Sequence, residues 1–300
     1  MKSEKIHEIA KELSDKYRIT KGEDFKLKQV DPGETGKKDR EDQPKSKEAL
    51  KKGIKALAAL QDKLYAQDQY SLLLIFQAMD AAGKDGAIKH VMSGVNPQGC
   101  QVASFKSPTS IDLDHDYLWR CNQQLPERGR IGIFNRSYYE ELLVVKVHPE
   151  FLQGQRLPPA LVDKDIWENR YKDIRNYEKY LSNNGTVIIK FFLHLSKDEQ
   201  KARFLERIEN PDKNWKFSSN DSKERTFWDE YMKAYEETVQ NTATKYAPWY
   251  VIPADNKWYT RIIVASAIID TLASLDLRYP KVDKKKLVEL EDAKKILLNE

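Results

Sequence analysis

Five short apolar segments, separated by long segments with helical spacing, constrain the fold of this 300-residue chain more than any other feature. They span residues 71–77, 102–105, 131–134, 186–195 and 249–253. The first, fourth and fifth lack a regular alternation of apolar and polar residues, which is typical of strands buried on both faces. Strands that alternate with helices predict an α/β fold, with a five-stranded parallel sheet flanked by helices and joined by right-handed connections.

The segments between the strands carry apolar residues at the spacing of an amphipathic helix. A long helix is predicted over residues 46–67, because Leu50, Ile54 and Leu57 fall on one face. Ser196 is predicted to cap a later helix, with Glu199 completing a capping box. The other predicted helices span residues 86–92, 113–124, 137–143, 164–183, 196–208, 226–242, 257–275 and 284–298.

Both ends of the chain are charged and are interpreted as additions to one main domain. Residues 1–45 are predicted to form a helical N-terminal extension followed by a linker, and residues 279–300 a basic C-terminal helix. The main domain is predicted to span residues 46–278. Its polar stretch between Glu209 and Lys223 is long for a simple connection, which predicts a helical lid at about residues 197–225.

The overall charge and the two cysteines exclude several classes of protein. Lys and Arg total 51 against 47 Asp and Glu, a balance of +4 that argues against a general nucleic-acid coat. The longest apolar runs are too short to span a bilayer, and no apolar signal core follows Met1. Cys100 and Cys121 indicate neither a disulfide framework nor a zinc site. We therefore expect a cytoplasmic protein that binds neither membrane nor nucleic acid.

The strongest chemical signal is the segment 77–86, which leads from the first strand into a helix. A strand that passes through small residues into a helix directs backbone N–H groups at one point and favours an anion, and Lys84 can reach the same phosphates. The segment departs from the standard phosphate loop, because Ala78 replaces its first glycine and Asp85 replaces its Ser or Thr. Asp80 is therefore the predicted Mg²⁺ ligand, since this ion prefers carboxylate and phosphate oxygens.

A second group of polar residues follows the third strand, at residues 135–141. Ligands of open parallel sheets collect at the carboxyl ends of the strands. Asn135 stands where phosphoryl-transfer enzymes often place a magnesium-linked aspartate. Arg136 offers the forked donor group that suits phosphate. A capped helix start with surface charges is the alternative interpretation of this segment.

Together these motifs resemble the polyphosphate kinase 2 family, with matching stretches at residues 76–86, 116–120, 134–140, 214–216 and 247–249. The resemblance covers about residues 45–278. It implies a P-loop NTPase-like, thymidylate-kinase-like fold with a helical lid. It also implies reversible, Mg²⁺-dependent transfer of the terminal phosphoryl group of inorganic polyphosphate to AMP and ADP, forming ADP and ATP. The form Asn-Arg-Ser-Tyr-Tyr-Glu at residues 135–140 is similar to the class III subgroup, which accepts both nucleotides.

The resemblance further implies roles for single residues. Asp80 would hold Mg²⁺, with Mn²⁺ as an alternative ion. Many members carry Asp at position 135, and because an amide is a neutral and weaker ligand, Asn135 would reach the metal through water. Arg136 would grip the transferred group, while the lid cations Arg203 and Arg207 would close over the phosphate chain. The predicted catalytic residues are Asp80, Lys84, Arg136, Arg203 and Arg207. The predicted binding residues are Ala81, Ala82, Gly83, Asp85, Gly86, Lys106, Asn135, Glu140, Lys213 and Lys216.

Other functions stay open at this point. A phosphohistidine route competes with direct transfer, although none of the five histidines falls within a phosphate-loop element. An ATP-dependent nucleoside monophosphate kinase of the same fold is a second candidate, and a non-catalytic module that binds polyanions is a third.

The resemblance also implies a homo-oligomer, and it leaves guanine nucleotides as further substrates.

Overall fold

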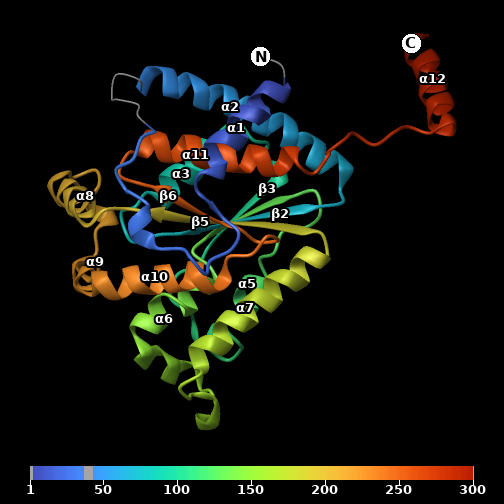
Figure 1. Ribbon diagram of the computed structural model, residues 1–300. Helices are drawn as coiled ribbons and strands as arrows, with labels where there is room; N and C mark the ends of the chain where they lie inside the picture. Colours follow the sequence, from blue (N-terminus) through green and yellow to red (C-terminus); the bar gives the residue numbers. More distant parts are fainter. Residues whose placement is uncertain (1–2, 37–42, 300) are drawn as a thin grey trace.

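A central six-stranded sheet, covered by helices on both faces, organises the molecule (Figure 1). The computed structural model describes residues 3–36 and 43–299. The strand order is β1-β6-β5-β2-β4-β3, in which β2 to β6 are parallel and β1 is antiparallel to β6. The strands are β1 Arg18–Ile19, β2 Ser71–Gln77, β3 Cys100–Ser104, β4 Ile131–Asn135, β5 Thr186–His194 and β6 Trp249–Pro253.

Two layers of helices enclose this sheet (Figure 1). One layer contains α1 Ser3–Asp15, α2 Gln43–Gln67, α3 Lys84–Val91 and α11 Lys257–Ala273. The other contains α5 Trp119–Asn122, α6 Val144–Val147, α7 Ile166–Asn183 and α10 Trp228–Thr242. Beyond the sheet lie α4 Ser110–Leu113, α8 Lys197–Glu209, α9 Ser219–Glu224 and α12 Lys284–Leu298, the last of which projects from the body. The described residues also form the 3₁₀ helices η1 Leu27–Gln29, η3 Pro97–Gly99, η4 Tyr138–Glu141, η5 Pro149–Gln155, η6 Pro159–Leu161, η7 Asn214–Lys216 and η8 Arg225–Phe227.

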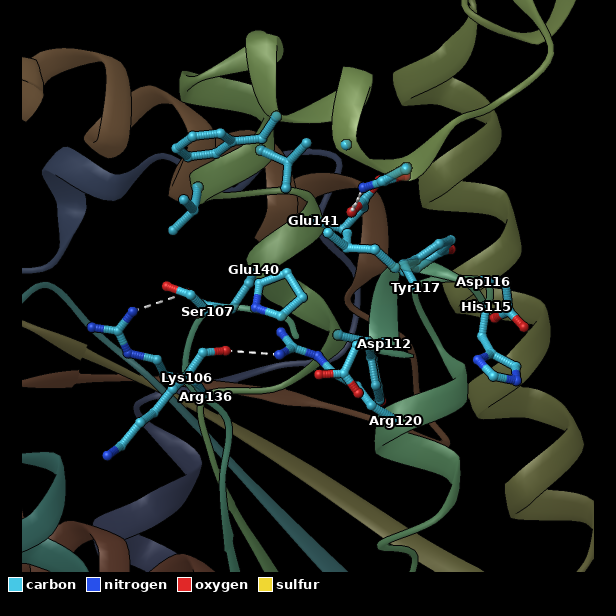
Figure 2. A pocket seen from close by; sticks show the side chains of 18 of the residues that line it. Lys106, Ser107, Asp112, His115, Asp116, Tyr117, Arg120, Arg136, Glu140 and Glu141 are labelled. Atoms are coloured by element: carbon cyan, nitrogen blue, oxygen red, sulfur yellow. Dashed lines mark hydrogen bonds and ion pairs between the residues drawn. The ribbon is translucent and has the colours of Figure 1, made fainter. Parts of the chain in front are cut away.

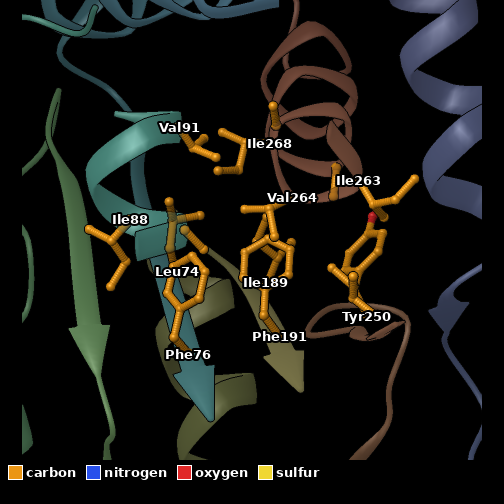
Figure 3. Close-up of a cluster of buried hydrophobic side chains, with 14 of the residues drawn as sticks. Leu74, Phe76, Ile88, Val91, Ile189, Phe191, Tyr250, Ile263, Val264 and Ile268 are labelled. Atoms are coloured by element: carbon orange, nitrogen blue, oxygen red, sulfur yellow. The ribbon is translucent and has the colours of Figure 1, made fainter. Parts of the chain in front are cut away.

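The position of β2 in the middle of the sheet explains why its sequence shows no alternation of apolar and polar residues. Successive side chains of a strand point to opposite faces, so a strand covered on both sides needs an apolar residue at each position. Leu74 and Phe76 enter the core beneath α3 and α11, whereas Leu73 and Ile75 enter the core on the opposite face. Figure 3 shows the first of these cores, in which β2 and β5 meet Ile88, Val91, Val264 and Ile268.

The sheet register places the two motifs side by side. Phe76 of β2 is the partner of Asn135 at the end of β4, and the Arg136 N–H donates to the Phe76 carbonyl at 3.0 Å. The chain therefore leaves both strands at the same carboxyl edge. This is the edge where ligands of open parallel sheets collect.

The N-terminal residues take a larger part in the fold than a separate extension would. Helix α1 packs against α11, and its Ala10 lies in the main core. Strand β1 pairs with β6 and makes the sheet six-stranded, where five strands were predicted. This strand could not be predicted from the sequence, because two residues are too few to show an apolar pattern. Residues 37–42 of the predicted linker lie outside the described part of the chain.

Several helices differ from their predicted form. The predicted helix at residues 113–124 is divided between α4 and α5, and that at 137–143 is the 3₁₀ helix η4. The segment 144–161, which has no predicted structure, forms α6, η5 and η6. The cap at Ser196 is confirmed, because its Oγ accepts the Glu199 N–H at 3.1 Å. The predicted capping box is wrong, because the Ser196 N–H donates to Asp255 and the Glu199 carboxylate accepts from Arg203. Within the described residues, every helix is either too short or too polar to cross a membrane.

Candidate active site

The turn at residues 78–83, here called the phosphate loop, connects β2 to α3. Gly83 is the N-cap of α3 and adopts φ 101°, a conformation that favours glycine. Ala81 adopts φ 63°, and backbone strain of this kind in a residue other than glycine is common at ligand sites. The Lys84 Nζ donates to the Ala78 carbonyl at 2.8 Å, so that the side chain folds back over the loop. Lys84 therefore lies at the phosphate loop, and the predicted contacts of Ala81, Ala82, Gly83, Asp85 and Gly86 with phosphate stay predictions.

The surroundings of Lys84 prepare it for an anion. Burial lowers the pKa of Lys84, and the positive charge of Arg136 lowers it further, against the opposing charges of Asp80 and Asp85. A phosphate oxygen beside the ammonium would favour its charged form. The loop therefore offers a cation whose charge is best stabilised when an anion is bound.

Arg136 lies between the phosphate loop and the neighbouring pocket. Its Nη2 donates to Asp80 Oδ1 at 2.8 Å, and its Nη1 donates to Glu140 Oε2 at 3.2 Å. These carboxylates, Glu140 first, raise the pKa of Arg136. Turning the Gln77 amide so that its nitrogen faces Glu140 satisfies both ends of this amide, with a 2.8 Å hydrogen bond to Glu140 Oε1. Arg136 itself adopts φ 64°, so that a strained backbone holds the guanidinium in this position.

The carboxylates of the loop are suited to a metal ion that arrives with phosphate. The described residues contain no cluster of three or more His, Cys, Asp or Glu side chains that could hold a metal. Mg²⁺ commonly takes only one or two protein carboxylates, together with substrate phosphates and water. Asp80 and Asp85 supply such oxygens at the phosphate loop. Asn135 Nδ2 donates to Asp85 Oδ1 at 2.7 Å, so Asn135 orients this carboxylate.

Arg203 is bonded to the backbone of the phosphate loop. The sequence predicted instead that its side chain would close over the phosphate chain. The side chain is buried, and its Nε donates to Glu199 at 2.8 Å. Its Nη1 donates to the carbonyls of Ala81 and Ala82, and its Nη2 donates to those of Ala254 and Asp255. A guanidinium has five N–H donors, so each donor of Arg203 has a protein acceptor. Burial decides this role, because spacing along a helix does not reveal which face is covered.

The other predicted lid cations lie on the surface of α8 and η7. Arg207 faces Asp221 of α9 at 3.8 Å. Burial and the charge of Asp80 raise the pKa of Asp221, which places this part of the lid within the electrostatic reach of the phosphate loop. Lys213 pairs with Glu206, and the ammonium of Lys216 lies 5.0 Å from the Trp215 ring centre. Their predicted contact with phosphate stays a prediction.

A cavity of about 470 Å³, here called the Arg136 pocket, opens beside Arg136 and Glu140 (Figure 2). Its volume is within the usual range for small-molecule sites. The predicted residue Lys106 lines it, and the Lys106 carbonyl accepts a 2.7 Å hydrogen bond from Arg120. The remaining lining residues come mainly from the segments 107–120 and 137–155.

Several polar residues of this pocket are not among the predicted site residues. The Arg120 guanidinium lies 5.6 Å from the Phe105 ring centre, and Arg120 lines the pocket. The buried Glu141, also in the lining, accepts hydrogen bonds from Gln155 at 2.7 Å and from Arg170 at 3.0 Å. Gln155 belongs to the segment without predicted structure, so no pattern indicated its position. Arg120 could have been found, since it ends the motif at residues 116–120.

Known proteins resemble this chain in sequence and in fold. Residues 39–280 match the family described as polyphosphate kinase 2 (PPK2). The ADP-polyphosphate phosphotransferase of Rhodopseudomonas palustris is 54% identical over 252 residues, which cover 84% of this chain and 87% of that protein. The AMP/ADP-polyphosphate phosphotransferase of Meiothermus ruber is 46% identical, over 89% of this chain and 95% of that protein. The crystal structure of polyphosphate kinase 2 from Arthrobacter aurescens is similar with a TM-score of 0.85 and 39% identity, over 94% of this chain and 96% of that one.

Proposed function

Because this chain belongs to the polyphosphate kinase 2 family, we propose that it transfers the terminal phosphoryl group of inorganic polyphosphate to AMP and ADP, forming ADP and ATP. The relatives support polyphosphate as the donor, since both named above are polyphosphate phosphotransferases. Their names differ in the nucleotide, because one specifies ADP and the other specifies AMP and ADP. The acceptor range is therefore the part of the proposal that an experiment must decide.

The observation that carries the proposal is the position of Arg136. Its guanidinium contacts Asp80 of the phosphate loop and Glu140 of the Arg136 pocket at the same time. A phosphate chain bound at the loop and a nucleotide bound in the pocket would therefore meet at one cation. Phosphoryl transfer depends mainly on such positioning and on positive charge around the transferred group.

We propose direct transfer between the two substrates. A terminal phosphate oxygen of the nucleotide attacks the terminal phosphorus of the polyphosphate, the bond from that phosphorus to the bridging oxygen breaks, and the shortened chain leaves with that oxygen. Lys84 and Arg136 stabilise the negative charge on the transferred group. Arg203 keeps the backbone of the loop in place through its bonds to the Ala81 and Ala82 carbonyls.

Magnesium is proposed as the accompanying ion, with Asp80 as its protein ligand and Asn135 acting through water. When bound, the ion supplies positive charge that offsets the charge of the phosphates. Asp80 supports this assignment, because its carboxylate lies in the phosphate loop beside Arg136. Mn²⁺ is proposed as an alternative ion, since it also prefers carboxylate and phosphate oxygens.

The surroundings of the histidines favour direct transfer over a phosphohistidine. His90 Nδ1 pairs with the Gly86 carbonyl at 2.8 Å, on the surface of α3. His115 lines the Arg136 pocket, and its ring stacks on Trp119 with ring centres 3.9 Å apart. A covalent route requires an imidazole nitrogen directed at the phosphate. An acid-labile phosphoenzyme, isolated after incubation with polyphosphate alone, would overturn the direct route.

Product analysis without ATP tests the proposed reaction. We expect the protein to convert AMP to ADP, and ADP to ATP, when it is mixed with polyphosphate and Mg²⁺. Chromatography of the nucleotides over time separates the two steps. Formation of these products only after ATP is added would favour an ATP-dependent nucleoside monophosphate kinase. Binding of polyphosphate without any product would favour the non-catalytic module.

Replacing Asp80 with asparagine tests the metal assignment. Asp80→Asn is expected to lower kcat by at least about 100-fold at limiting Mg²⁺, because a neutral amide is a weaker ligand than a carboxylate. The measurement is turnover against Mg²⁺ concentration. Glu140→Gln is the matched control, since it also removes a carboxylate from Arg136 without touching the metal. A wild-type Mg²⁺ dependence in the Asp80 variant would show that the assignment is wrong.

Three further properties complete the proposal. We propose a cytoplasmic enzyme, because its substrates are nucleotides and because Cys100 and Cys121 are free thiols. A homo-oligomer is proposed from the family resemblance, and light scattering checks it. Guanine nucleotides are proposed as additional acceptors, and the product assay with GMP and GDP checks them.

A further inference from the structure

A buried histidine connects the wall of the Arg136 pocket to the lid. His148 follows α6 directly, and its Nε2 pairs with Glu224 Oε2, the last residue of α9, at 3.0 Å. Tyr231 of α10 donates to the same Glu224 oxygen at 2.7 Å. The Phe227 ring packs edge-on against the imidazole, with ring centres 4.6 Å apart. His148 is only 8% exposed, so its ring is fixed by packing as well as by polar contacts.

On one side, His148 belongs to the segment that forms the pocket. Val144 and Val145, in the helix that His148 ends, line the Arg136 pocket, as do Glu150 and Phe151 just after it. The Glu150 carboxylate also approaches His148 Nδ1 at 3.4 Å. A nucleotide that displaces this wall would therefore displace the imidazole with it.

On the other side, Glu224 belongs to a chain of contacts that ends at the phosphate loop. The next residue, Arg225, donates to Gln200 Oε1 of α8 at 2.9 Å. Gln200 in turn donates to the Asp80 carbonyl at 3.0 Å. The lid is thus connected to the phosphate loop at one end and to the pocket wall, through His148, at the other.

We propose that the His148–Glu224 contact is a positioning contact that couples nucleotide binding in the Arg136 pocket to placement of the lid, residues 197–225, over the phosphate loop. The inference depends on the proposed function, because it takes the nucleotide as the ligand of this pocket. His148 acts through the lid and touches no reacting atom. Coupling between two sites requires a physical element that both sites bias, and this contact joins the two elements concerned.

The substitution His148→Phe tests the coupling, since phenylalanine keeps an aromatic ring in the packed site but lacks Nε2. In the wild-type protein, AMP is expected to slow hydrogen–deuterium exchange of residues 210–224 by about fivefold or more. In His148→Phe this lid protection is expected to disappear, whereas AMP still protects residues 106–120 of the pocket. We also expect KM for AMP to rise about tenfold, the usual size of a lost hydrogen bond to a charged group.

His7→Phe is the matched control, because His7 Nε2 pairs with Asp270 Oδ1 at the same distance of 3.0 Å, between α1 and α11. It is expected to keep the wild-type KM and the wild-type lid protection.

Glu224→Met removes the proposed contact from the lid side and is expected to reproduce the effect of His148→Phe. Lid protection that persists in both variants would overturn the proposal. Failure of AMP to protect residues 106–120 in the wild type would instead contradict the proposed function.

Discussion

Replacing Arg136 with alanine is expected to lower kcat by about 10³–10⁵-fold, the range reported for loss of an arginine that stabilises transferred phosphoryl groups. This loss corresponds to roughly 4–7 kcal/mol of activation free energy. The reason is the position of the guanidinium, which contacts both Asp80 and Glu140. Alanine leaves these two carboxylates near the phosphates without a cation between them. Steady-state turnover with polyphosphate and AMP measures the effect.

Two further variants separate charge from geometry. Arg136→Lys is expected to remain strongly impaired, because an ammonium cannot present two parallel donors as a guanidinium does. Arg278→Ala is the control, since Arg278 pairs with Asp276 on the surface and is expected to keep full turnover. A loss of less than tenfold in Arg136→Ala would contradict the central role of this residue.

Replacing Lys190 with methionine is expected to lower the free energy of unfolding by about 3–5 kcal/mol. Lys190 and Glu178 are completely buried, and the Nζ–Oε2 distance is 2.7 Å. Lys190 also donates to the Thr242 carbonyl at 2.8 Å, while Tyr138 and Tyr139 both donate to Glu178 Oε1. Methionine fills a similar volume but leaves the carboxylate without its cation. Urea denaturation followed by circular dichroism measures the loss.

The control for this prediction is the same substitution on the surface. Lys286 pairs with Glu289 at 2.9 Å on α12, where both side chains are exposed. Lys286→Met is expected to change stability by no more than about 1 kcal/mol, because water screens exposed ion pairs. An equally small effect at Lys190 would show that packing alone holds this part of the core. The buried pair matters for the site as well, because the two tyrosines follow Arg136 after one residue.

Much of the sheet is predictable from the sequence, because burial on both faces demands long apolar runs. The bounds of β2 and β6 agree with their predicted ranges, and those of β3, β4 and β5 differ by one or two residues. Strand β1 could not be predicted, since its two residues gain their conformation from pairing with β6. The family and the phosphate loop could be predicted, because residues 77–86 form one continuous motif.

The candidate site shows the limit of such prediction. Asp80, Lys84 and Arg136 come together as their motifs indicate. Arg203 shares its helix with Arg207 and carries the same charge, yet its donors are used by the backbone of the phosphate loop. Gln155 lines the Arg136 pocket, although the segment that contains it shows no regular spacing of apolar residues.

Five of the six strands, the long helices between them, the phosphate loop and the family are predictable from local sequence, because apolar spacing and a continuous motif need no distant partner. Long-range packing was needed to show that residues 3–36 join the main fold, that Arg203 donates to the backbone of the phosphate loop and that His148 contacts the lid. These roles depend on which partner satisfies a buried polar group. That partner is distant in the chain, as with Arg203 and Ala81, which are 122 residues apart.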